Sequence, residues 1–228
     1  MMDNITIYNG NFVNFLDEFP DGLILTDPPY NQNYKYNTYK DNLKTSEYIE
    51  LLGNLPLPCV IIHYPEETIN ILPKAFKTDV CDIITWFYNT NTYKQSRLIS
   101  FWGCKSNLDY LKQPAKNQSD KRVKNLKVRS YDYWHIQQVK NISKTKYDHP
   151  CQLPEQLIKN ILSVVRKSDN TFFDTIIDPF MGTGTVLKIA LEMGYKVFGC
   201  EIDEKYFKIC EDRLSTYQIN LFGDSWTT

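Results

Sequence analysis

Two short segments of the chain carry side chains and backbone shapes that suit chemistry. The first is the tetrad Asp27-Pro28-Pro29-Tyr30, which follows the apolar, strand-length run Gly22–Thr26. Its prolines fix the backbone and remove two N–H donors, so the tetrad presents carbonyls between a carboxylate and an aromatic ring. The second is Asp178–Thr185, which contains Gly182 and Gly184 and follows another apolar run. We expect both segments at the carboxyl edge of an α/β sheet, where such folds bind ligands.

The tetrad suits an amine that is attached to an aromatic ring. Such an amine is a poor nucleophile, because its lone pair is delocalised into the ring. The Asp27 carboxylate and the Pro28 carbonyl can accept its two N–H bonds and stabilise the positive charge that grows on nitrogen. Tyr30 can stack on the ring of a base that has been flipped out of a duplex. The electrophile would be a positively charged methyl donor held in line beside the amine, with no metal. A rigid surface turn is the structural alternative.

The second segment begins a pattern that is typical of nucleoside binding. A strand that ends at Asp178, a tight glycine turn, a helix and another strand form a βαβ unit, which requires a parallel sheet. Gly182 and Gly184 allow a ligand to approach the backbone, and the helix N-terminus can receive a carboxylate or phosphate. Glu201 ends the next strand and is placed to hold a ribose diol. A structural glycine turn and a solvated acid are the alternatives.

Strand and helix patterns alternate along most of the chain, and the chain is long enough for one large α/β domain with a small insertion. Apolar runs predict strands over residues 5–8, 22–26, 59–63, 80–87, 98–102, 172–177 and 195–200. Helical patterns are predicted over 12–16, 46–52, the stretch after Pro65, 153–165, 185–193 and 203–214. The strands at 80–87 and 98–102 are expected to pair as an antiparallel hairpin.

Charge is unevenly distributed along the chain. The net charge is −1, but residues 105–147 hold eleven Lys or Arg against three Asp, which leaves −9 on the rest. This basic segment also contains Tyr110, Tyr131, Tyr133 and Trp134. Basic residues interleaved with aromatic ones suit a nucleic-acid surface. A solvated insertion with a few packing aromatic residues is the alternative.

Composition argues against a membrane, secreted or metal-binding protein. No apolar run approaches the roughly 20 residues that span a bilayer, and the N-terminus lacks a signal-peptide pattern. The six cysteines are scattered without a Cys-x-x-Cys, which indicates reduced core thiols. None of the three histidines pairs with a cysteine at ligand spacing. We expect a cytoplasmic protein.

The two segments together resemble those of the amino-group DNA methyltransferases that use S-adenosylmethionine. The resemblance lies in Asp27-Pro28-Pro29-Tyr30-Asn31 and Asp178-Pro179-Phe180-x-Gly182-x-Gly184-Thr185. The catalytic motif comes first, the cofactor motif last and the basic segment between, which resembles the β-type permutation of the family. Further similar stretches are Ile84-Thr85-Trp86 with Leu98–Trp102, His149–Glu155, Gly199-x-Glu201-x-Asp203-x-x-Tyr206 and Arg213-Leu214.

The resemblance implies a fold and a division of the chain. The fold is α/β, a Rossmann-like, mixed but mostly parallel sheet with helices on both faces, circularly permuted motif order and a small basic insertion. Residues 1–104 would form the catalytic half of the domain and residues 149–228 its cofactor-binding half. Residues 105–148 would be the basic insertion that recognises the target.

The resemblance also implies a reaction. The enzyme would transfer a methyl group from S-adenosylmethionine to the N6 amino group of a flipped-out adenine in double-stranded DNA. Asp27 supports adenine, because a serine is more usual at this position in cytosine-N4 enzymes. The alternatives are an N4-cytosine DNA methyltransferase, a protein or RNA methyltransferase, and a non-catalytic DNA-binding protein that keeps the fold. A membrane partner is not expected, whereas a homodimer and a cognate restriction endonuclease stay open.

Site residues are carried over position by position. Asn11 stands where the family commonly has an aspartate beside the adenine of the cofactor, and Leu153 replaces a lysine of the His-Pro element. The catalytic residues implied are Asp27, Pro28, Pro29 and Tyr30. The cofactor-binding residues implied are Asn11, Asp27, Asp178, Phe180, Gly182, Thr183, Gly184, Thr185 and Glu201. The DNA-binding residues expected from charge are Lys121, Arg122, Lys124, Lys127 and Arg129.

Overall fold

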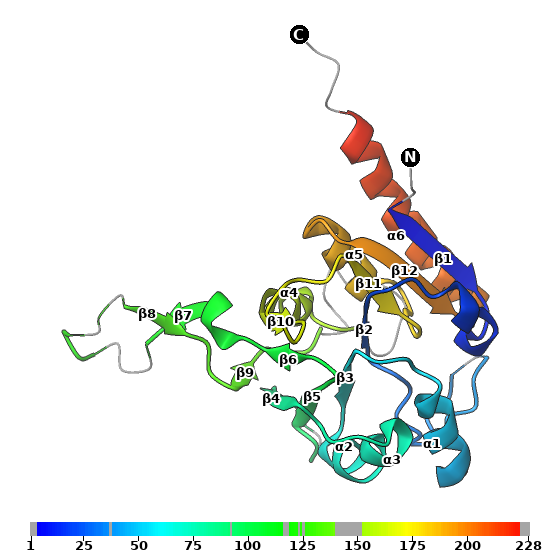
Figure 1. Ribbon diagram of the computed structural model, residues 1–228, viewed down its shortest axis with the longest axis horizontal. Coiled ribbons are helices and arrows are strands. Elements are labelled where there is room, and N and C mark those ends of the chain that lie inside the picture. The colour runs from blue at the N-terminus through cyan, green and yellow to red at the C-terminus, as the bar shows by residue number, and fades with distance from the viewer. Residues whose placement is uncertain are drawn as a thin grey trace.

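An eight-stranded sheet forms the centre of the protein in the computed structural model (Figure 1). The structure describes residues 4–36, 38–91, 93–115, 119–122, 124, 126–139 and 152–223, with side chains as far as residue 215. In spatial order the strands are β1 (Ile5–Asn9), β12 (Lys196–Glu201), β11 (Thr175–Asp178), β2 (Leu23–Thr26), β3 (Cys59–His63), β5 (Ser96–Trp102), β4 (Asp82–Phe87) and β9 (Tyr133–His135). Two smaller sheets pair β6 (Lys105–Ser106) with β10 (Val165–Arg166), and β7 (Lys112–Pro114) with β8 (Lys127–Arg129).

Within the large sheet, β5 runs antiparallel to both of its neighbours, and the other neighbouring strands are parallel. This confirms the predicted mixed, mostly parallel sheet and the predicted hairpin, which is β4–β5. The carboxyl ends of the parallel strands meet at one edge. Because β5 is reversed, its first residues lie at that same edge, with Arg97 opposite Trp86.

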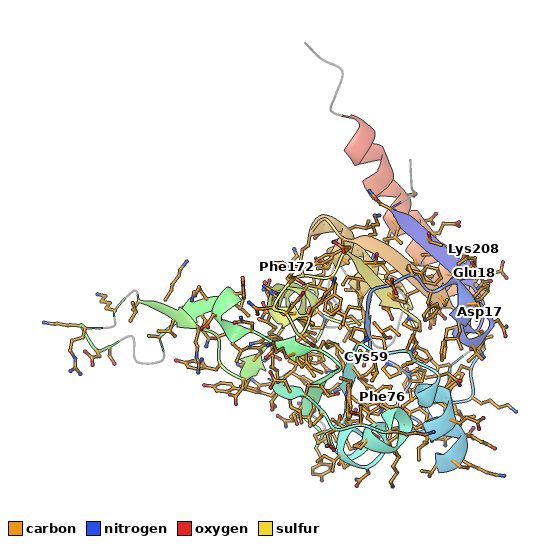
Figure 2. All side chains as sticks on the ribbon, in the orientation of Figure 1. Asp17, Glu18, Cys59, Phe76, Phe172 and Lys208 are labelled. Atoms are coloured by element: carbon orange, nitrogen blue, oxygen red, sulfur yellow. The ribbon has the colours of Figure 1, made fainter. Side chains whose placement is uncertain are left out.

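Helices cover both faces of the sheet, as predicted. The α-helices are α1 (Thr45–Gly53), α2 (Pro65–Asn70), α3 (Leu72–Phe76), α4 (Glu155–Val164), α5 (Thr185–Glu192) and α6 (Glu204–Gly223), and the 3-10 helices are η1 (Phe12–Glu18) and η2 (Leu108–Tyr110). Leu23 and Leu25 join the apolar cluster that α4 and α5 cover, whereas Ile24 joins the cluster under α1 and α3. This alternation is the period of two expected of a strand buried on both faces. Cys59 on β3 and Phe76 on α3, both labelled in Figure 2, contribute to the second of these clusters.

Most helix boundaries follow local backbone chemistry. The helix expected from residue 153 begins at Glu155, because Pro154 has an extended backbone and forms the N-cap. The helix expected from Ser46 begins at Thr45, where the Lys44 N–H donates to the Glu47 carboxylate. Gly194 follows α5 with a left-handed φ of 87°, which is the C-terminal position predicted for it.

Parts of the basic segment at 105–148 pair with strands outside it. Its β9 pairs with β4 as the edge strand of the large sheet, and its β6 pairs with β10. The arm formed by β7 and β8 extends away from the sheet (Figure 1). The last part of this segment, together with His149, Pro150 and Cys151 of the family-like element, lies outside the described residues.

The composition predicted reduced, buried cysteines and no membrane-spanning segment. Cys59, Cys104, Cys200 and Cys210 are buried free thiols, as predicted, but Cys81 is exposed just before β4. In the part of the chain that the structure describes, no helix is both long and apolar enough to cross a membrane.

Candidate active site

A cavity at the carboxyl edge of the sheet brings the two predicted segments together. It contains every catalytic and cofactor-binding residue expected from the sequence except Gly184. The lining residues are Gly10, Asn11, Phe12, Asp27, Pro28, Pro29, Tyr30, Tyr36, Thr38, Tyr39, Leu51, Gln152, Leu153, Asp178, Pro179, Phe180, Met181, Gly182, Thr183, Thr185, Val186, Glu201, Ile202, Asp203 and Tyr206. The cavity therefore joins the ends of β1, β2, β11 and β12, the neighbouring strands that carry both motifs.

A hydrogen bond ties the two segments to each other. The Thr26 hydroxyl, immediately before the tetrad, donates to Asp178 Oδ1 at 2.6 Å. Asp178 Oδ1 also accepts the Phe180 N–H at 3.2 Å, which starts the turn after β11. Asp178 is buried, and burial raises the pKa of its carboxyl to about 7. These two hydrogen bonds are made within the protein, and they fix the shape of the loop that follows β11.

Glu201 holds the glycine loop against the end of β12. Its Oε2 accepts the Gly182 N–H and its Oε1 accepts the Asp203 N–H, each at 2.8 Å. Burial raises the pKa of this carboxyl. Each carboxylate oxygen keeps a second lone pair, so Glu201 can hold the loop and still accept a hydroxyl from the cavity. Asp203 in turn caps α6 through the N–H groups of Lys205 and Tyr206.

The two glycines of the loop have different surroundings. Both adopt left-handed backbone conformations, with φ of 52° at Gly182 and 77° at Gly184. Gly182 lines the cavity. A Cβ on Gly184 would lie 2.3 Å from the Cys210 sulfur. Gly184 therefore allows α6 to pack closely, and the ligand contact expected of this glycine stays a prediction.

Aromatic and amide groups complete the cofactor side of the cavity. Phe12 is buried and packs against Phe180, with ring centroids 5.0 Å apart. Asn11 uses its side-chain carbonyl to accept the Val13 N–H at 3.2 Å, which caps η1. An apolar wall, a carboxylate at Glu201 and an approachable glycine backbone suit the base, the ribose and the amino-acid end of a nucleoside cofactor. Thr183 and Thr185 also line the cavity and are contacted by Arg213.

The tetrad forms a chain of contacts that reaches β5. The Tyr30 hydroxyl donates to Asp27 Oδ1, and the Arg97 Nε–H donates to the Tyr30 oxygen at 2.7 Å. Burial raises the pKa of the Asp27 carboxyl to about 6, against the lowering effect of the Arg97 charge and the Tyr30 bond. The tetrad is thus polar, partly desolvated and electrically linked to a buried cation.

A second chain of hydrogen bonds supports the proline turn. Tyr64 N–H donates to His63 Nδ1 at 2.9 Å, so His63 carries its proton on Nε2. That nitrogen lies 2.7 Å from the Tyr48 oxygen, and the Tyr48 hydroxyl donates to the Pro29 carbonyl at 2.7 Å. Burial lowers the pKa of His63 to about 3, so the ring is neutral. These bonds hold the Pro29 carbonyl in place, whereas the Pro28 carbonyl takes no part in this chain of bonds.

The loop after the tetrad folds over the cavity. The Asp41 carboxylate accepts the N–H groups of Asn31, Gln32 and Tyr34 at 2.7, 3.0 and 2.9 Å. Farther along, the Thr38 hydroxyl donates to Asp203 Oδ2 at 2.7 Å. The loop therefore joins the tetrad to the start of α6 across the opening.

Arg97, Tyr48 and His63 were not among the residues expected from the sequence. The apolar run that ends at His63 and the hairpin pattern near Arg97 place both residues at strand ends on the side of the tetrad, which is a weak signal. Tyr48 could not be found in this way, because its contact depends on how α1 packs over β3.

The expected DNA-binding residues lie on the β7–β8 arm, which extends away from the large sheet (Figure 1). All five are exposed, and Lys127 and Arg129 belong to β8. Arg122 is paired with Asp120, with Nη2 and Oδ2 2.7 Å apart. Among the residues that the structure describes, no cluster of His, Cys, Asp and Glu is arranged to hold a metal ion.

Known proteins resemble this chain in sequence and in fold. A family model described as DNA methylase, named for N6 and N4 methylation, matches residues 53–212. The type II methyltransferase M.HpaI of Haemophilus parainfluenzae is 26% identical, over 88% of this chain and 70% of that protein.

Solved structures share the fold. The M1.HpyAVI complex with S-adenosylmethionine has a TM-score of 0.56 at 22% identity, and the match covers 91% of this chain and 98% of that one. The cytosine-N4-specific PvuII DNA methyltransferase has a TM-score of 0.61 at 14% identity, covering 96% and 93%. The family match spans well over half of the chain and agrees with the expected cofactor, S-adenosylmethionine. The chain belongs to the DNA methylase family of S-adenosylmethionine-dependent N6/N4 amino-methyltransferases.

Proposed function

We propose that this DNA methyltransferase modifies the N6 amino group of an adenine that has been flipped out of double-stranded DNA. The observation that carries the proposal is the joining of the tetrad and the glycine loop in one cavity, through the Thr26–Asp178 hydrogen bond. An amine held at Asp27 would then lie beside the cofactor side of the cavity. A turn without catalytic use would not need this proximity.

The residues of the cavity fit S-adenosylmethionine. Phe12 and Phe180 offer an apolar wall for the adenine ring of the cofactor, and Asn11 lies beside that wall. Glu201 offers carboxylate oxygens for the ribose hydroxyls, and Gly182 offers close backbone approach. When bound, this cofactor supplies a methyl group on a positively charged sulfur.

The protein's own groups prepare the amine of the target base. The Asp27 carboxylate accepts one N–H of that amine. Tyr48 holds the Pro29 carbonyl, so we assign the second N–H to the Pro28 carbonyl. Both acceptors stabilise the positive charge on nitrogen as the new N–C bond forms. The nitrogen then loses one proton, and the Asp27 carboxyl, with a pKa raised to about 6, is basic enough to take it.

Adenine is favoured over cytosine by the residue at the first position of the tetrad. An aspartate there resembles the adenine-N6 enzymes of the family. The N4-cytosine alternative is favoured by the similarity of fold to the cytosine-N4-specific PvuII enzyme. Both bases carry a conjugated amine that needs two acceptors, so the chemistry of the tetrad serves either one.

Identification of the methylated nucleoside tests the proposal. The protein is incubated with unmethylated duplex DNA and methyl-labelled S-adenosylmethionine, and the DNA is digested to nucleosides. Label in N6-methyl-2′-deoxyadenosine supports the proposal. Label in N4-methyl-2′-deoxycytidine overturns the assignment of the base, and the absence of label from DNA overturns the activity.

A pair of variants tests the role of the tetrad. Asp27→Ala should keep cofactor binding and lose methyl transfer, because one acceptor for the amine is gone. Asp17→Ala is the matched control, because Asp17 is an exposed carboxylate on η1 (Figure 2). Normal transfer by Asp27→Ala would overturn the assignment.

We further assign target recognition to the basic segment at 105–148. Residues 1–104 would then supply the base pocket and residues 149–228 the cofactor pocket of one domain. The exposure and charge of the β7–β8 arm support the assignment, since phosphate contacts need accessible cations. A second copy of the chain and a cognate restriction endonuclease are partner hypotheses that rest on the family alone.

A further inference from the structure

A buried arginine lies behind the tetrad. Arg97 is 8% exposed and follows Tyr30 by 67 residues, yet its Nε is 2.7 Å from the Tyr30 oxygen. The reversed direction of β5 brings it there, because the start of β5 lies at the edge where the parallel strands end. Arg97 does not belong to the cavity lining, so it acts on the site through another residue.

Aromatic rings surround the guanidinium. Its carbon lies 4.9 Å from the ring centroid of Tyr30, 4.4 Å from Tyr64, 5.7 Å from Trp86 and 5.4 Å from Tyr88. Ring faces attract cations, and the attraction is greatest where water is excluded. A buried arginine without a carboxylate in direct contact is nonetheless costly. Such an arrangement is expected where the cation serves a purpose other than packing.

The hydrogen bonds of the guanidinium are incomplete. Nε donates to Tyr30, and Nη2 donates to the Tyr64 oxygen at 3.3 Å. Nη1 is buried and has no hydrogen-bond partner among the residues that the structure describes. The negative charge that balances Arg97 is reached through Tyr30, whose hydroxyl donates to Asp27. Tyr30 is therefore a bridge between the buried cation and the catalytic carboxylate.

This bridge is compatible with base binding. The Tyr30 hydroxyl donates its proton to Asp27 Oδ1, and the carboxylate keeps further lone pairs that can accept an N–H of the incoming amine. The Arg97 bond uses a lone pair of the phenol oxygen and not its proton. Arg97 can therefore hold the Tyr30 ring in place while the carboxylate accepts the amine.

We propose that Arg97 is a positioning residue for methyl transfer, which anchors the Tyr30 phenol and holds Asp27 in its charged form through it. The proposal rests on the function proposed for the tetrad. The groups that interact electrostatically with the Asp27 carboxylate are Arg97, Tyr30, the Asp178 carboxyl on β11 and the Tyr48 hydroxyl on α1. Arg97 and Tyr30 lower the pKa of Asp27 whereas burial raises it, so removal of Arg97 should raise it further.

Three variants separate this role from packing. Arg97→Met fills the space without charge, and Arg97→Lys keeps the charge without the fixed fork of donors. Tyr64→Phe is the matched control, because it removes one hydrogen bond of the same guanidinium and leaves the Tyr30–Asp27 bond intact. The quantities measured are kcat, KM for DNA, the dissociation constant for S-adenosylmethionine, and kcat/KM against pH.

Arg97→Met should lower kcat about tenfold or more, as expected from the loss of a charged hydrogen bond. The dissociation constant for S-adenosylmethionine should be unchanged, and the acidic limb of the kcat/KM profile should move to higher pH. In Arg97→Lys the acidic limb should lie at its wild-type pH again, and part of kcat should be recovered. Tyr64→Phe should leave that limb where it is. A normal kcat and an unmoved limb in Arg97→Met would overturn the proposal.

Tyr30→Phe keeps the test decisive if Arg97→Met fails to fold. It removes the bridging hydroxyl and keeps the ring, so its acidic limb should shift in the same direction. An unmoved limb in Tyr30→Phe overturns the proposal. If the wild-type protein methylates DNA and Asp27→Ala does not, then failure of these variants refutes the role of Arg97 alone. If Asp27→Ala still methylates DNA, the proposed function itself has failed.

Discussion

The hydroxyl of Thr26 donates to Asp178 across 152 residues of sequence, at the point where β2 and β11 both end. Each strand continues directly into one of the two functional segments. Because both residues are buried, water cannot replace this bond when it is lost. The bond therefore sets the distance between the tetrad and the glycine loop, and its removal should affect both stability and cofactor binding.

Thr26→Val tests this relationship, since valine keeps the shape of threonine and removes the hydroxyl. We expect a loss of about 1–3 kcal/mol in the free energy of unfolding, because the Asp178 carboxyl loses a buried donor. Binding of S-adenosylmethionine should weaken as well. Urea denaturation and calorimetric titration measure the two effects.

Thr68→Val is the control for Thr26→Val. Thr68 is also buried, and its hydroxyl donates to the Tyr64 carbonyl at 3.0 Å, away from the glycine loop. It should lose stability while keeping its affinity for the cofactor. Equal affinity in the two variants would contradict a role for Thr26 in joining the segments.

The sheet around Thr26 could be predicted because each of its strands corresponds to an apolar run in the sequence. The runs that form β2, β3, β11 and β12 are apolar and buried on both faces, and helical stretches separate them. The tetrad and Asp178 follow such runs immediately. Their meeting at one edge follows from parallel pairing, before any side-chain contact is known.

Other parts of the site depend on tertiary packing, which local sequence patterns do not predict. The strand β9 has three residues inside a polar, basic stretch, and Trp134 is the one that is buried. Arg97 reaches Tyr30 because of the register between β4 and β5. Tyr48 reaches Pro29 because α1 turns the face that carries Tyr48 and Leu52 inward. Each contact joins segments whose relative position is decided by the whole fold.

Gly184 gives a second prediction, about how the glycine loop meets α6. Gly184→Ala should lower stability by about 1–3 kcal/mol, because it adds a left-handed strain and a Cβ that would lie 2.3 Å from the Cys210 sulfur. Adding Cys210→Ala should recover part of the loss, since the sulfur is removed and the backbone strain stays. Thermal and urea unfolding of the single and double variants measure this.

Gly194→Ala separates strain from collision in the Gly184 experiment. Gly194 has a similar φ of 87°, and a Cβ there would meet nothing within 4 Å. Its substitution should cost about 1 kcal/mol from backbone strain, which is less than the cost at Gly184. If contact with α6 were unimportant, Gly184→Ala would lose no more stability than Gly194→Ala.

The neutral His63 predicts a pH dependence of stability. Burial and the positive charges of Arg97 and Lys94 lower its folded-state pKa to about 3, so its 3.7 Å contact with Glu67 is not an ion pair. The unfolded state takes up a proton near pH ~6.5 and the folded state does not. The stability contributed by neutral His63 is thus present above pH ~6.5 and is lost as pH falls toward about 3.

His63→Gln removes this proton linkage. Between about pH 7.5 and about pH 5, the wild-type protein should lose about 2 kcal/mol more of its unfolding free energy than the variant does. Urea denaturation at the two pH values measures the difference. Tyr48→Phe is a second control, because it removes the hydrogen bond to His63 and keeps the imidazole. The imidazole can still take up a proton in the unfolded state, so the pH dependence of stability should remain. A loss of equal size in wild type and His63→Gln would show that His63 is charged in the folded protein.

The last prediction concerns the β7–β8 arm and DNA. Lys127 and Arg129 are exposed on β8. If each contacts one phosphate, their replacement by alanine should weaken binding and reduce the slope of log K against log salt by about 2, because fewer counterions are released.

Lys196→Ala with Lys208→Ala is the charge-matched control for the arm. Both side chains are exposed on β12 and α6, and Figure 2 shows Lys208 on the far side of the molecule from the arm. This pair removes the same net charge without touching the arm. If the two double variants lose equal affinity with equal slopes, the effect comes from overall charge, and the arm does not contact DNA. A loss confined to Lys127 and Arg129 locates the phosphate contacts on β8, because a general electrostatic attraction would respond to both pairs alike.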